Sequence, residues 1–498
     1  MDTQNRLLSA IAEHIDISPS DFLLAQERYR AVKDWLMAGS YDSGFSPEVY
    51  LQGSFRLGTV VKPYRGDKDG QFDIDQVFEL TQPCEQPSAY ALKRDVGNRL
   101  NGRADYERML DDEGSRCWTL EYAAAHNRPA FHLDILPSLS SQVRPGGQID
   151  ITDKGDQGYS WLVSNPKDYY QWFKSKNVYS PEFITEQKSV IFDANQTLFS
   201  RSEDVPIRLL RSPLQRAIQI MKRHRDVYFN GKNYRPISII ITTIAAQIHD
   251  SLNISQIIEK FTAYVAEGHE LLLCTGSIER DSIMMYKNGV WLIPNPVIPN
   301  RGDGEMENFA DKWNEDSGFA IAFFEWSQQL ARDASGFSES LVSDDLNLRI
   351  KCFGDGSVYS KIVSSRLADR LTQNWGDTDE LLSLIHLAVE GNFAWSAVES
   401  AAQKILDQSQ SQCCEDVARV NFYQVPRHQG RELSPEAKAD VDNILSRNQE
   451  DSAFVLCCHL LLGSATQKMV RDCITSRGSA DVLGWPILRL APPEILGF

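Results

Sequence analysis

Hydrophobic residues recur every three or four positions along residues 20–37, and charged residues fill the positions between them. That period predicts an α-helix with one buried face. Residues 58–61 and 71–80 are short apolar segments joined by a polar, glycine-containing stretch, which predicts two strands. A third strand is predicted over residues 131–136, ending at Pro137. Strands so far apart in the sequence, with helical stretches between them, favour a mixed α/β architecture.

The pattern becomes helical from about residue 205. Ser212 before Pro213 is a favourable helix start, and apolar residues then follow at helical spacing. A second apolar segment opens at Pro236, but its many isoleucines leave helix and strand both open. Residues 319–334 predict a further helix. The basic residues 223–225 are expected on a solvated face.

The last part of the chain, from about residue 366, differs from the rest. Four helices are predicted there, separated by loops rich in Ser, Gln and Gly: residues 380–390, 394–406, 435–445 and 453–462. The adjacent cysteines at 413–414 and 457–458 are expected to be core thiols, because neighbours on one element point in different directions and do not suit a zinc site. A domain for partner binding, sensing or oligomerisation fits this pattern, as does a lid.

Composition and charge narrow the function classes. The 498 residues carry 51 Lys and Arg against 68 Asp and Glu, a net charge of −17, and 42% are hydrophobic. These values argue against a disordered tail protein and a generally basic nucleic-acid-binding protein, so a polyanionic ligand requires a local site. No secretory signal and no apolar stretch of membrane-spanning length is visible, and nine cysteines suit reduced thiols. A cytoplasmic protein with no membrane partner is expected.

The first segment with candidate chemistry is residues 52–59. Gly53 lets the backbone approach a ligand closely, and Ser54 adds a hydroxyl donor beside free N–H groups, a combination that suits a phosphate. Gly-Ser pairs are common in loops, however. The pair gains meaning only from the acidic residues that follow it.

Those acidic residues are Asp73, Asp75 and Asp134. Residues i and i+2 of a strand face the same side, so Asp73 and Asp75 project together, and a divalent cation such as Mg²⁺ or Mn²⁺ would relieve their repulsion. Asp134 lies on an otherwise apolar segment, where an unpaired charge is costly. A solvated strand face and a structural salt bridge are the simpler alternatives. Three carboxylates after a Gly-Ser turn favour a two-metal phosphoryl-transfer site.

This combination resembles the nucleotidyltransferase superfamily, and more narrowly the cGAS/DncV-like nucleotidyltransferases of bacterial anti-phage signalling, which make cyclic oligonucleotides. The resemblance covers roughly residues 20–330. Six blocks carry it: residues 52–59, 72–80, 133–137, 214–226, 236–246, and 295–296 with 307–313. The polar residues 300–304 separate the two parts of the last block, so Asn295, Glu307 and Asp311 are assigned to fold support.

The resemblance implies a mixed α+β fold in three parts. A nucleotidyltransferase palm with an N-terminal helix spans residues 1–205, a helical lobe over residues 206–365 completes the nucleotide cleft, and a mainly helical extension spans residues 366–498. The implied substrates are nucleoside triphosphates, ATP among them, joined into a cyclic di- or trinucleotide second messenger with release of pyrophosphate. A downstream effector would bind the product.

The resemblance also implies which residues act. Three aspartates hold two Mg²⁺ or Mn²⁺ ions and help to activate the attacking ribose hydroxyl: Asp73, Asp75 and Asp134. Five residues bind the nucleotide, mainly its phosphates: Gln52, Gly53, Ser54, Lys222 and Ser238. For Lys222 the pattern agrees, because this residue lies eight positions after Leu214 on the inward stripe of its helix.

Two other functions stay open. A template-independent transferase would add nucleotides to an RNA or protein acceptor, but the charge of −17 disfavours a long RNA, and no stable nucleic-acid partner is expected. An inactive nucleotide-binding scaffold on the same fold would typically have lost a carboxylate. The C-terminal residues 491–498 contain two prolines and are expected to be extended. In some related systems a ubiquitin-like ligase acts on the C-terminus, whereas a frayed end is the simpler alternative.

Overall fold

The computed structural model describes residues 3–41, 47–62, 64–65, 68–69, 72–81, 86–123, 130–141, 147–177, 179–250, 253–298, 306–335, 352–353, 395–408, 412–448, 452–477, 487, 490–491 and 495. The chain divides into two compact units, one of residues 1–337 with 348–355 and the other of residues 338–347 with 356–498. Within the described parts, no helix has the length and apolar character to cross a membrane. The finer division of the first unit at residue 205 stays a prediction.

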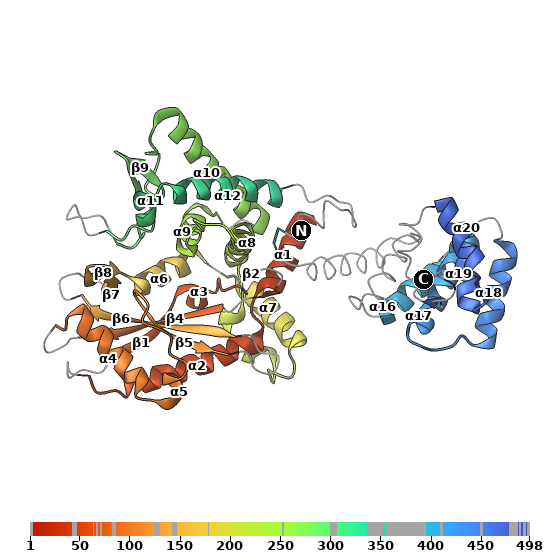
Figure 1. Cartoon of the computed structure of the whole chain (residues 1–498), viewed down its shortest axis with the longest axis horizontal. Coiled ribbons are helices and arrows are strands. Elements are labelled where there is room, and N and C mark those ends of the chain that lie inside the picture. Colours follow the sequence, from red (N-terminus) through yellow and green to blue (C-terminus); the bar gives the residue numbers. More distant parts are fainter. Residues whose placement is uncertain are drawn as a thin grey trace. The chain divides into compact units, whose positions relative to one another are not determined.

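A six-stranded mixed sheet forms the centre of the first unit (Figure 1). Its strands are β1 (Glu48–Gln52), β4 (Phe72–Leu80), β5 (Trp118–Tyr122), β6 (Phe131–Ser140), β7 (Ile149–Gly155) and β8 (Gly158–Ser164). The order across the sheet is β1, β4, β6, β7, β8, and β5 also pairs with β6. β4 and β6 run parallel, whereas the other neighbours run antiparallel. The predicted mixed α+β fold is confirmed.

Helices α2 (Pro19–Met37) and α4 (Ala89–Asn101) pack on one face of this sheet (Figure 1). The apolar stripe predicted for residues 20–37 is the buried side of α2, and the backbone N–H of Asp21 donates to the capping Ser18 hydroxyl. Alternate residues of β4 enter the same core: Phe72, Ile74, Phe78 and Leu80. Because side chains alternate along a strand, the residues between them face the opposite side of the sheet.

Five helices pack together beyond that opposite side: α1 (Thr3–Ile15), α8 (Pro213–Tyr228), α9 (Ser238–Ile248), α10 (Ile254–Thr275) and α12 (Gly318–Ala334). The predicted start of α8 is confirmed, since Ser212 and Gln215 form a reciprocal capping box. The isoleucine-rich segment after Pro236 is the helix α9, most of whose residues are buried. α12 confirms the helix predicted over residues 319–334.

Further helices, strands and turns connect the sheet and these helices. They are α3 (Gly53–Leu57), β2 (Tyr64–Arg65), β3 (Lys68–Asp69), α5 (Ala104–Glu107), α6 (Pro166–Lys176), α7 (Pro181–Ala194), two 3₁₀ turns (Ser202–Asp204 and Ile207–Leu209), β9 (Met285–Lys287), β10 (Val290–Leu292) and α11 (Asp311–Glu315).

The strand predicted over residues 58–61 is wrong. Gly58 ends α3 in the left-handed conformation, with φ of 69°. The next residues have no regular secondary structure and join none of the sheets in the part of the chain that the structure describes. Instead, α8 side chains donate hydrogen bonds to this segment's carbonyl groups, those of Leu57, Thr59, Val60 and Lys62. A helix thus provides the partners that a neighbouring strand would have supplied.

Pro137 does not end its strand, contrary to the prediction. β6 continues to Ser140, and Pro137 stays in register with Phe78 of β4. On the other side of β6, β5 pairs as far as Ile135 and β7 begins at Ser138. Pro137 falls between these two partners, a position where the missing N–H of proline is tolerated.

The second unit contains five described helices: α16 (Trp395–Gln408), α17 (Gln412–His428), α18 (Pro435–Arg447), α19 (Ser452–Leu462) and α20 (Gln467–Arg477). α16, α18 and α19 confirm three predicted helices, whereas residues 380–390 lie outside the described residues. α17 was missed, and it carries Pro426 near its end, a residue that normally signals a helix boundary. The expected core thiol Cys458 is buried in the apolar core of this unit.

Candidate active site

A row of polar side chains crosses three strands on the sheet face opposite α2. Asp73 and Asp75 alternate with the core residues of β4. In the strand register, Asp75 lies opposite Gln52 of β1 on one side and opposite Asp134 of β6 on the other. The three predicted carboxylates therefore come from adjacent parallel strands. The sequence could not predict this register, because 58 residues lie between Asp75 and Asp134, and the two become neighbours only through the fold.

Burial and mutual repulsion raise the pKa of two of these carboxylates. Burial, followed by the negative charges of Asp134 and Asp73, raises the pKa of Asp75 to about 7. Burial also raises the pKa of Asp134, although the hydroxyl of Thr119 donates to its Oδ1 at 2.6 Å and works in the opposite direction. A divalent cation binds such a group of carboxylates favourably, because it removes the repulsion between them.

The turn before α3 brings backbone directly against Asp75. Gly53 has φ of +63°, and a Cβ at this position would lie 2.7 Å from Asp75 Cγ and still closer to one carboxylate oxygen. Both the conformation and the space therefore require glycine. Ser54 follows in the first turn of α3, and its carbonyl accepts from the Thr59 N–H at 2.9 Å. The predicted Gly-Ser pair thus lies at the acidic row.

The buried polar side of α8 holds the segment that follows α3. Four of its side chains donate to successive carbonyl groups, in the pairs Gln215 to Leu57 (2.7 Å), Lys222 to Thr59 (2.8 Å), Gln219 to Val60 (2.7 Å) and Arg223 to Lys62 (2.7 Å). We call these four bonds the α8 clamp. Because every donor is buried, the clamp fixes the position of the Gly53–Ser54 turn relative to α8.

Lys222 is the member of the α8 clamp that the sequence analysis predicted to bind the nucleotide. The structure buries it on the inward side of α8, with 5% of its surface exposed. Burial, and then the neighbouring Arg225, lowers the pKa of Lys222 to about 8, while Asp226, Asp73 and Asp75 act in the opposite direction. Its nearest bond is to a backbone carbonyl, so the structure itself explains the inward position without an added anion.

The basic run at residues 223–225 is not solvated, contrary to the prediction. Arg223, His224 and Arg225 are all buried. Arg225 donates to Ser238 Oγ at 2.8 Å and to the Pro236 carbonyl at 3.1 Å, and it pairs with the adjacent Asp226. Sequence reasoning missed Arg225 and Asp226, because charged residues become buried only where other parts of the chain supply partners.

These side chains surround a pocket of about 470 Å³, which we call the basic pocket. Six of the predicted site residues line it: Gly53, Ser54, Asp73, Asp75, Lys222 and Ser238. Three further charged residues were not predicted: Arg225, Asp226 and Arg235. Asp134 and Gln52 are not in this lining. Asp134 is the β6 neighbour of Asp75 in the strand register, and Gln52 lines a second pocket.

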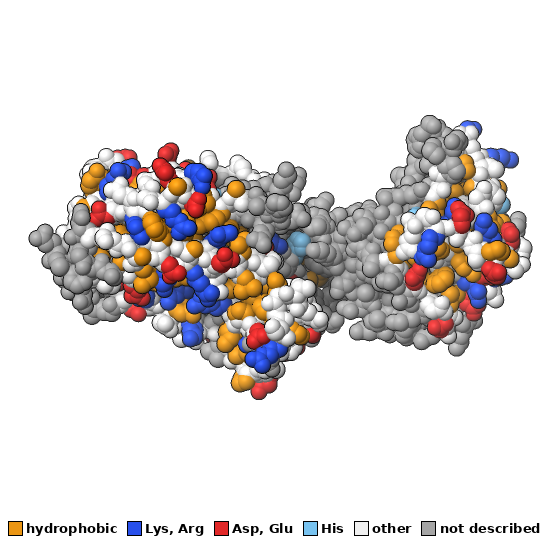
Figure 2. All heavy atoms as spheres, turned by 90° about the horizontal axis from the view of Figure 1, so that it is seen from below, with side chains coloured by type: hydrophobic (Ala, Val, Ile, Leu, Met, Phe, Trp, Pro, Cys, Tyr) orange, Lys and Arg blue, Asp and Glu red, His pale blue; other side chains and the backbone are white. Residues whose placement is uncertain are grey.

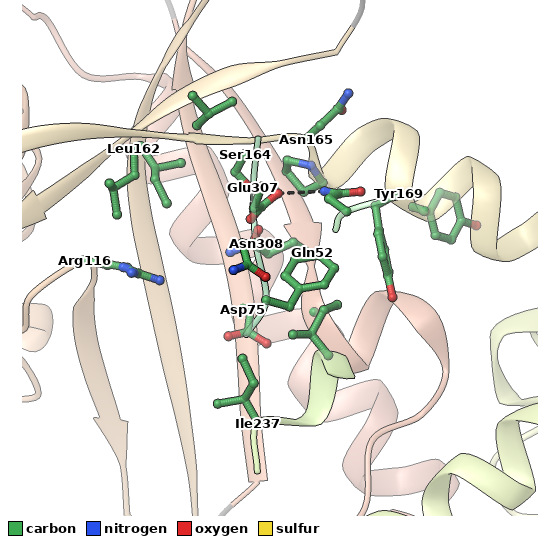
Figure 3. Close-up of a pocket in the computed structure, with 18 of the residues that line it drawn as sticks. Gln52, Asp75, Arg116, Leu162, Ser164, Asn165, Tyr169, Ile237, Glu307 and Asn308 are labelled. Carbon is green, nitrogen blue, oxygen red and sulfur yellow. Dashed lines mark hydrogen bonds between the residues drawn. The ribbon is translucent and has the colours of Figure 1, made fainter. Parts of the chain in front are cut away.

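The second pocket, of about 680 Å³, lies on the other side of Asp75 and is called here the aromatic pocket (Figure 3). It shares Gly53, Leu57, Asp75, Ile237 and Ile239 with the basic pocket. Four aromatic residues line it: Trp161, Tyr169, Tyr170 and Phe309. Its polar lining includes Arg116, Ser164, Asn165, Asn295, Glu307 and Asn308. The two pockets therefore meet at the predicted catalytic carboxylate.

The fold brings together two parts of the block that the sequence analysis had separated. The Asn295 N–H donates to the Glu307 carbonyl at 2.9 Å, and Asn295 Nδ2 donates to Glu307 Oε2 at 2.7 Å (Figure 3). Asn295 and Glu307 do support the fold through these bonds. They also line the aromatic pocket, a role that their assignment to fold support did not include.

The acidic row has the chemistry of a divalent-cation site. In the described parts of the chain, no three His, Cys, Asp or Glu side chains are already arranged as a metal-binding group. The conclusion that the acidic row suits a divalent cation therefore rests on the chemistry of its carboxylate ligands. Three carboxylates lie on adjacent strands, and burial and mutual repulsion raise the pKa of Asp75 and of Asp134. Hard oxygen ligands under such repulsion suit Mg²⁺ or Mn²⁺.

Comparison with known proteins agrees with this geometry. Residues 1–177 match the family described as the Second Messenger Oligonucleotide or Dinucleotide Synthetase domain. Residues 1–177 of this chain are therefore similar to that synthetase domain. This confirms the predicted cGAS/DncV-like nucleotidyltransferase, an enzyme class that joins nucleoside triphosphates into second messengers.

A curated relative and a solved structure extend the match beyond residue 177. The "c-di-GMP synthase" of Roseivirga ehrenbergii is 26% identical over 373 residues, which are 74% of this chain and 89% of the relative. The structure of CdnG from Bradyrhizobium diazoefficiens in complex with GTP has a TM-score of 0.58 and 20% identity, and the match covers 73% of this chain and 98% of CdnG. This second similarity shows a shared fold. Both matches leave about a quarter of this chain uncovered.

Proposed function

We propose that this synthetase uses GTP as a substrate and makes a guanine-containing cyclic dinucleotide with release of pyrophosphate. The observation that carries the proposal is the position of Asp75 between the two pockets. Joining two nucleotides requires a triphosphate and an attacking hydroxyl on opposite sides of one catalytic centre. The related "c-di-GMP synthase" and the GTP complex of CdnG support guanine as one of the bases.

The basic pocket is suited to the triphosphate. Lys222, Arg225 and Arg235 supply positive charge, and the Gly53–Ser54 turn supplies backbone and a hydroxyl. The hydroxyl of Ser238 accepts a hydrogen bond from Arg225, so its own proton is available to a phosphate oxygen. Lys222 and Arg225 are buried, so they are held in place before a ligand arrives, which lowers the entropic cost of orienting the phosphates for in-line attack.

Asp73, Asp75 and Asp134 are the proposed catalytic residues. Two divalent cations held by these carboxylates, Mg²⁺ or Mn²⁺, would neutralise the triphosphate and lower the pKa of the attacking hydroxyl. Thr119 fixes the Asp134 carboxylate by its 2.6 Å hydrogen bond. Gln52 flanks Asp75 on the opposite strand and faces the aromatic pocket, where the nucleotide that carries the attacking hydroxyl would lie.

Mass spectrometry of products made by the full chain from all four nucleoside triphosphates, with Mg²⁺ or Mn²⁺, tests this proposal. We expect phosphatase-resistant cyclic dinucleotides that contain guanine, together with pyrophosphate. Products that form only after addition of RNA would instead identify a transferase acting on RNA ends. On the face shown in Figure 2, the described Lys and Arg side chains lie among Asp, Glu and hydrophobic side chains and do not form, among the described residues, the continuous basic surface that suits a long RNA.

The remaining predicted partners follow from this activity. An effector that binds the cyclic product would carry the signal in the cytoplasm, and anti-phage defence is the proposed setting. A ubiquitin-like ligase acting on the C-terminus stays a prediction, and residues 496–498 lie outside the described residues. The second unit has no proposed catalytic role, because all of the site residues belong to the first unit.

A further inference from the structure

Glu307 presents acceptor oxygens at the polar edge of the aromatic pocket (Figure 3). Its Oε1 accepts from the Ser164 hydroxyl at 3.2 Å, and its Oε2 accepts from Asn295 Nδ2 at 2.7 Å. A carboxylate has about four acceptor sites on its two oxygens, so each oxygen can accept a further hydrogen bond. The two existing donors hold the carboxylate in one orientation.

Neighbouring polar groups in the pocket are committed to the protein. Asn308 Oδ1 accepts from the backbone N–H groups of Ile293 and Ala310, and its Nδ2 donates to the Trp291 carbonyl. Asn165 is likewise engaged, because it exchanges hydrogen bonds with Asp168 through both side-chain atoms. These amides shape the pocket, and Glu307 is the group on this edge with paired acceptor capacity.

We propose that Glu307 determines base specificity in the aromatic pocket by accepting hydrogen bonds from the N1–H and the 2-amino group of guanine. This inference rests on the proposed nucleotide-joining function. Guanine carries two adjacent donors on this edge, which match the two oxygens of a carboxylate. Adenine presents an acceptor at N1, and uracil has a single ring N–H between two carbonyl groups. The aromatic lining offers faces on which the base stacks.

Nucleoside monophosphates test the inference most directly, because they lack the triphosphate that the basic pocket is expected to bind. Affinities of GMP, IMP and AMP are measured for the full chain by calorimetry, without divalent cations. IMP lacks the 2-amino group, so it should bind more weakly than GMP. Glu307→Gln should weaken GMP binding about 10- to 100-fold, the discrimination typical of a bidentate base contact. It should leave the affinity for AMP unchanged or increased, since an amide pairs with adenine.

Two variants serve as controls. Asp156→Asn removes an exposed carboxylate in the turn between β7 and β8, outside the lining of both pockets, and it should leave the GMP affinity unchanged. Glu307→Asp keeps two acceptor oxygens and should retain the preference for GMP over AMP, with weaker binding of both. A structural role alone would reduce the binding of all three nucleotides equally. Equal affinities of the wild type for GMP and IMP overturn the inference, as does an unchanged preference in Glu307→Gln.

Two further measurements distinguish a failure of the inference about Glu307 from a failure of the proposed function. If Glu307→Gln does not fold, GMP is compared with its N1-methyl derivative on the wild type, and equal affinities overturn the inference. Incorporation from equimolar GTP and ATP is then measured by mass spectrometry. A wild type that binds GMP selectively but forms no product contradicts the proposed function and leaves the role of Glu307 intact. Normal turnover in Glu307→Gln, with an unchanged guanine content of the product, contradicts only the role of Glu307.

Discussion

The two pockets that meet at Asp75 differ in the side chains that line them. The cationic side chains of Lys222, Arg225 and Arg235 line the basic pocket together with Asp73 and Asp75. The lining of the aromatic pocket includes four aromatic rings, asparagine amides bonded to the protein, and the Glu307 carboxylate. A triphosphate is the same for every base, so charge and backbone suffice to bind it. A base is recognised by its shape and by the order of its donors and acceptors. The difference between the pockets therefore separates binding of the common part from selection of the variable part.

Asp75 is the group on which both pockets depend, so Asp75→Asn should have the largest effect. The loss of one negative charge weakens cation binding and removes the group that faces both nucleotides. We expect pyrophosphate release to fall at least about 10³-fold, the usual scale for loss of a central electrostatic group. The matched control is Asp156→Asn, in the exposed turn between β7 and β8. Turnover within a few-fold of wild type in the Asp75 variant would remove Asp75 from the catalytic site.

Gly53→Ala should displace Asp75, the carboxylate at which the two pockets meet. The added methyl group would overlap the Asp75 carboxylate, and the φ of +63° is unfavourable for alanine. Displacement of a catalytic group by about 1 Å commonly costs about 10²-fold in turnover, and we expect a loss of that size. Gly155→Ala is the control, because nothing lies within 4 Å of a Cβ there. Similar steady-state rates for the two variants would contradict the close packing at Gly53.

The contrast between local and distant signals explains what the sequence could predict. Helices α2 and α8 and strand β4 were predicted because their periodicity is written in consecutive residues. The Asp73–Asp75 pair followed from the same periodicity. Residues 58–61 were misassigned because their apolar pattern is that of a strand, while their hydrogen-bond partners come from α8, far along the chain. Local pattern reports which residues are buried, but it does not report what they pack against.

The aromatic pocket shows the same limit. It combines residues of β8 and α6 with the segment around Glu307, and no short motif relates them. Asn295 and Glu307 were noticed as parts of one family block, and residues 300–304 between them argued against a shared role. Their direct hydrogen bond shows that chain separation was a poor guide.

Lys222→Met tests whether the basic pocket acts by charge. Lys222 and Gln219 both donate to carbonyls of the same segment, at 2.8 Å and 2.7 Å, but only Lys222 lines the pocket. Removal of either donor leaves a buried carbonyl unpaired, which should lower the free energy of unfolding by about 1–3 kcal/mol. Only Lys222→Met should also raise the Kd for GTP, by about 10-fold or more, since a charge-assisted bond to phosphate is lost. Chemical denaturation and GTP titration of both variants provide the comparison.

The Gln219→Met variant decides how that result is interpreted. Equal losses of GTP affinity in both variants would show that Lys222 acts through the α8 clamp and not through its charge. A loss confined to Lys222→Met, with equal losses of stability, would assign the phosphate contact to Lys222. The pKa of about 8 adds a second readout, because the contribution of Lys222 to GTP binding should decline as the pH rises above about 8.

The pH dependence of the aromatic pocket gives the smallest predicted effect. Burial raises the pKa of Glu307 to about 7, against the bonds from Asn295 and Ser164 and the charge of Arg116, while Asp311 acts in the same direction as burial. Because the proposed base contact requires the ionised carboxylate, the affinity for GMP should fall about 10-fold between pH 8 and pH 6. Glu307→Gln should not show this change, and neither should AMP binding to the wild type.

Stability should change with pH in the opposite direction. The folded-state pKa of Glu307 lies above the ordinary value of 4.5, so between pH 4.5 and about 7 the folded protein retains a proton that the unfolded chain has lost. Raising the pH through this window therefore lowers the free energy of unfolding, and Glu307→Gln should reduce that slope. Thermal unfolding of the two proteins at pH 5, 6, 7 and 8 measures the difference. Parallel curves would mean that Glu307 ionises in the fold as readily as in the unfolded chain, and the pH dependence of GMP binding would then need another titrating group.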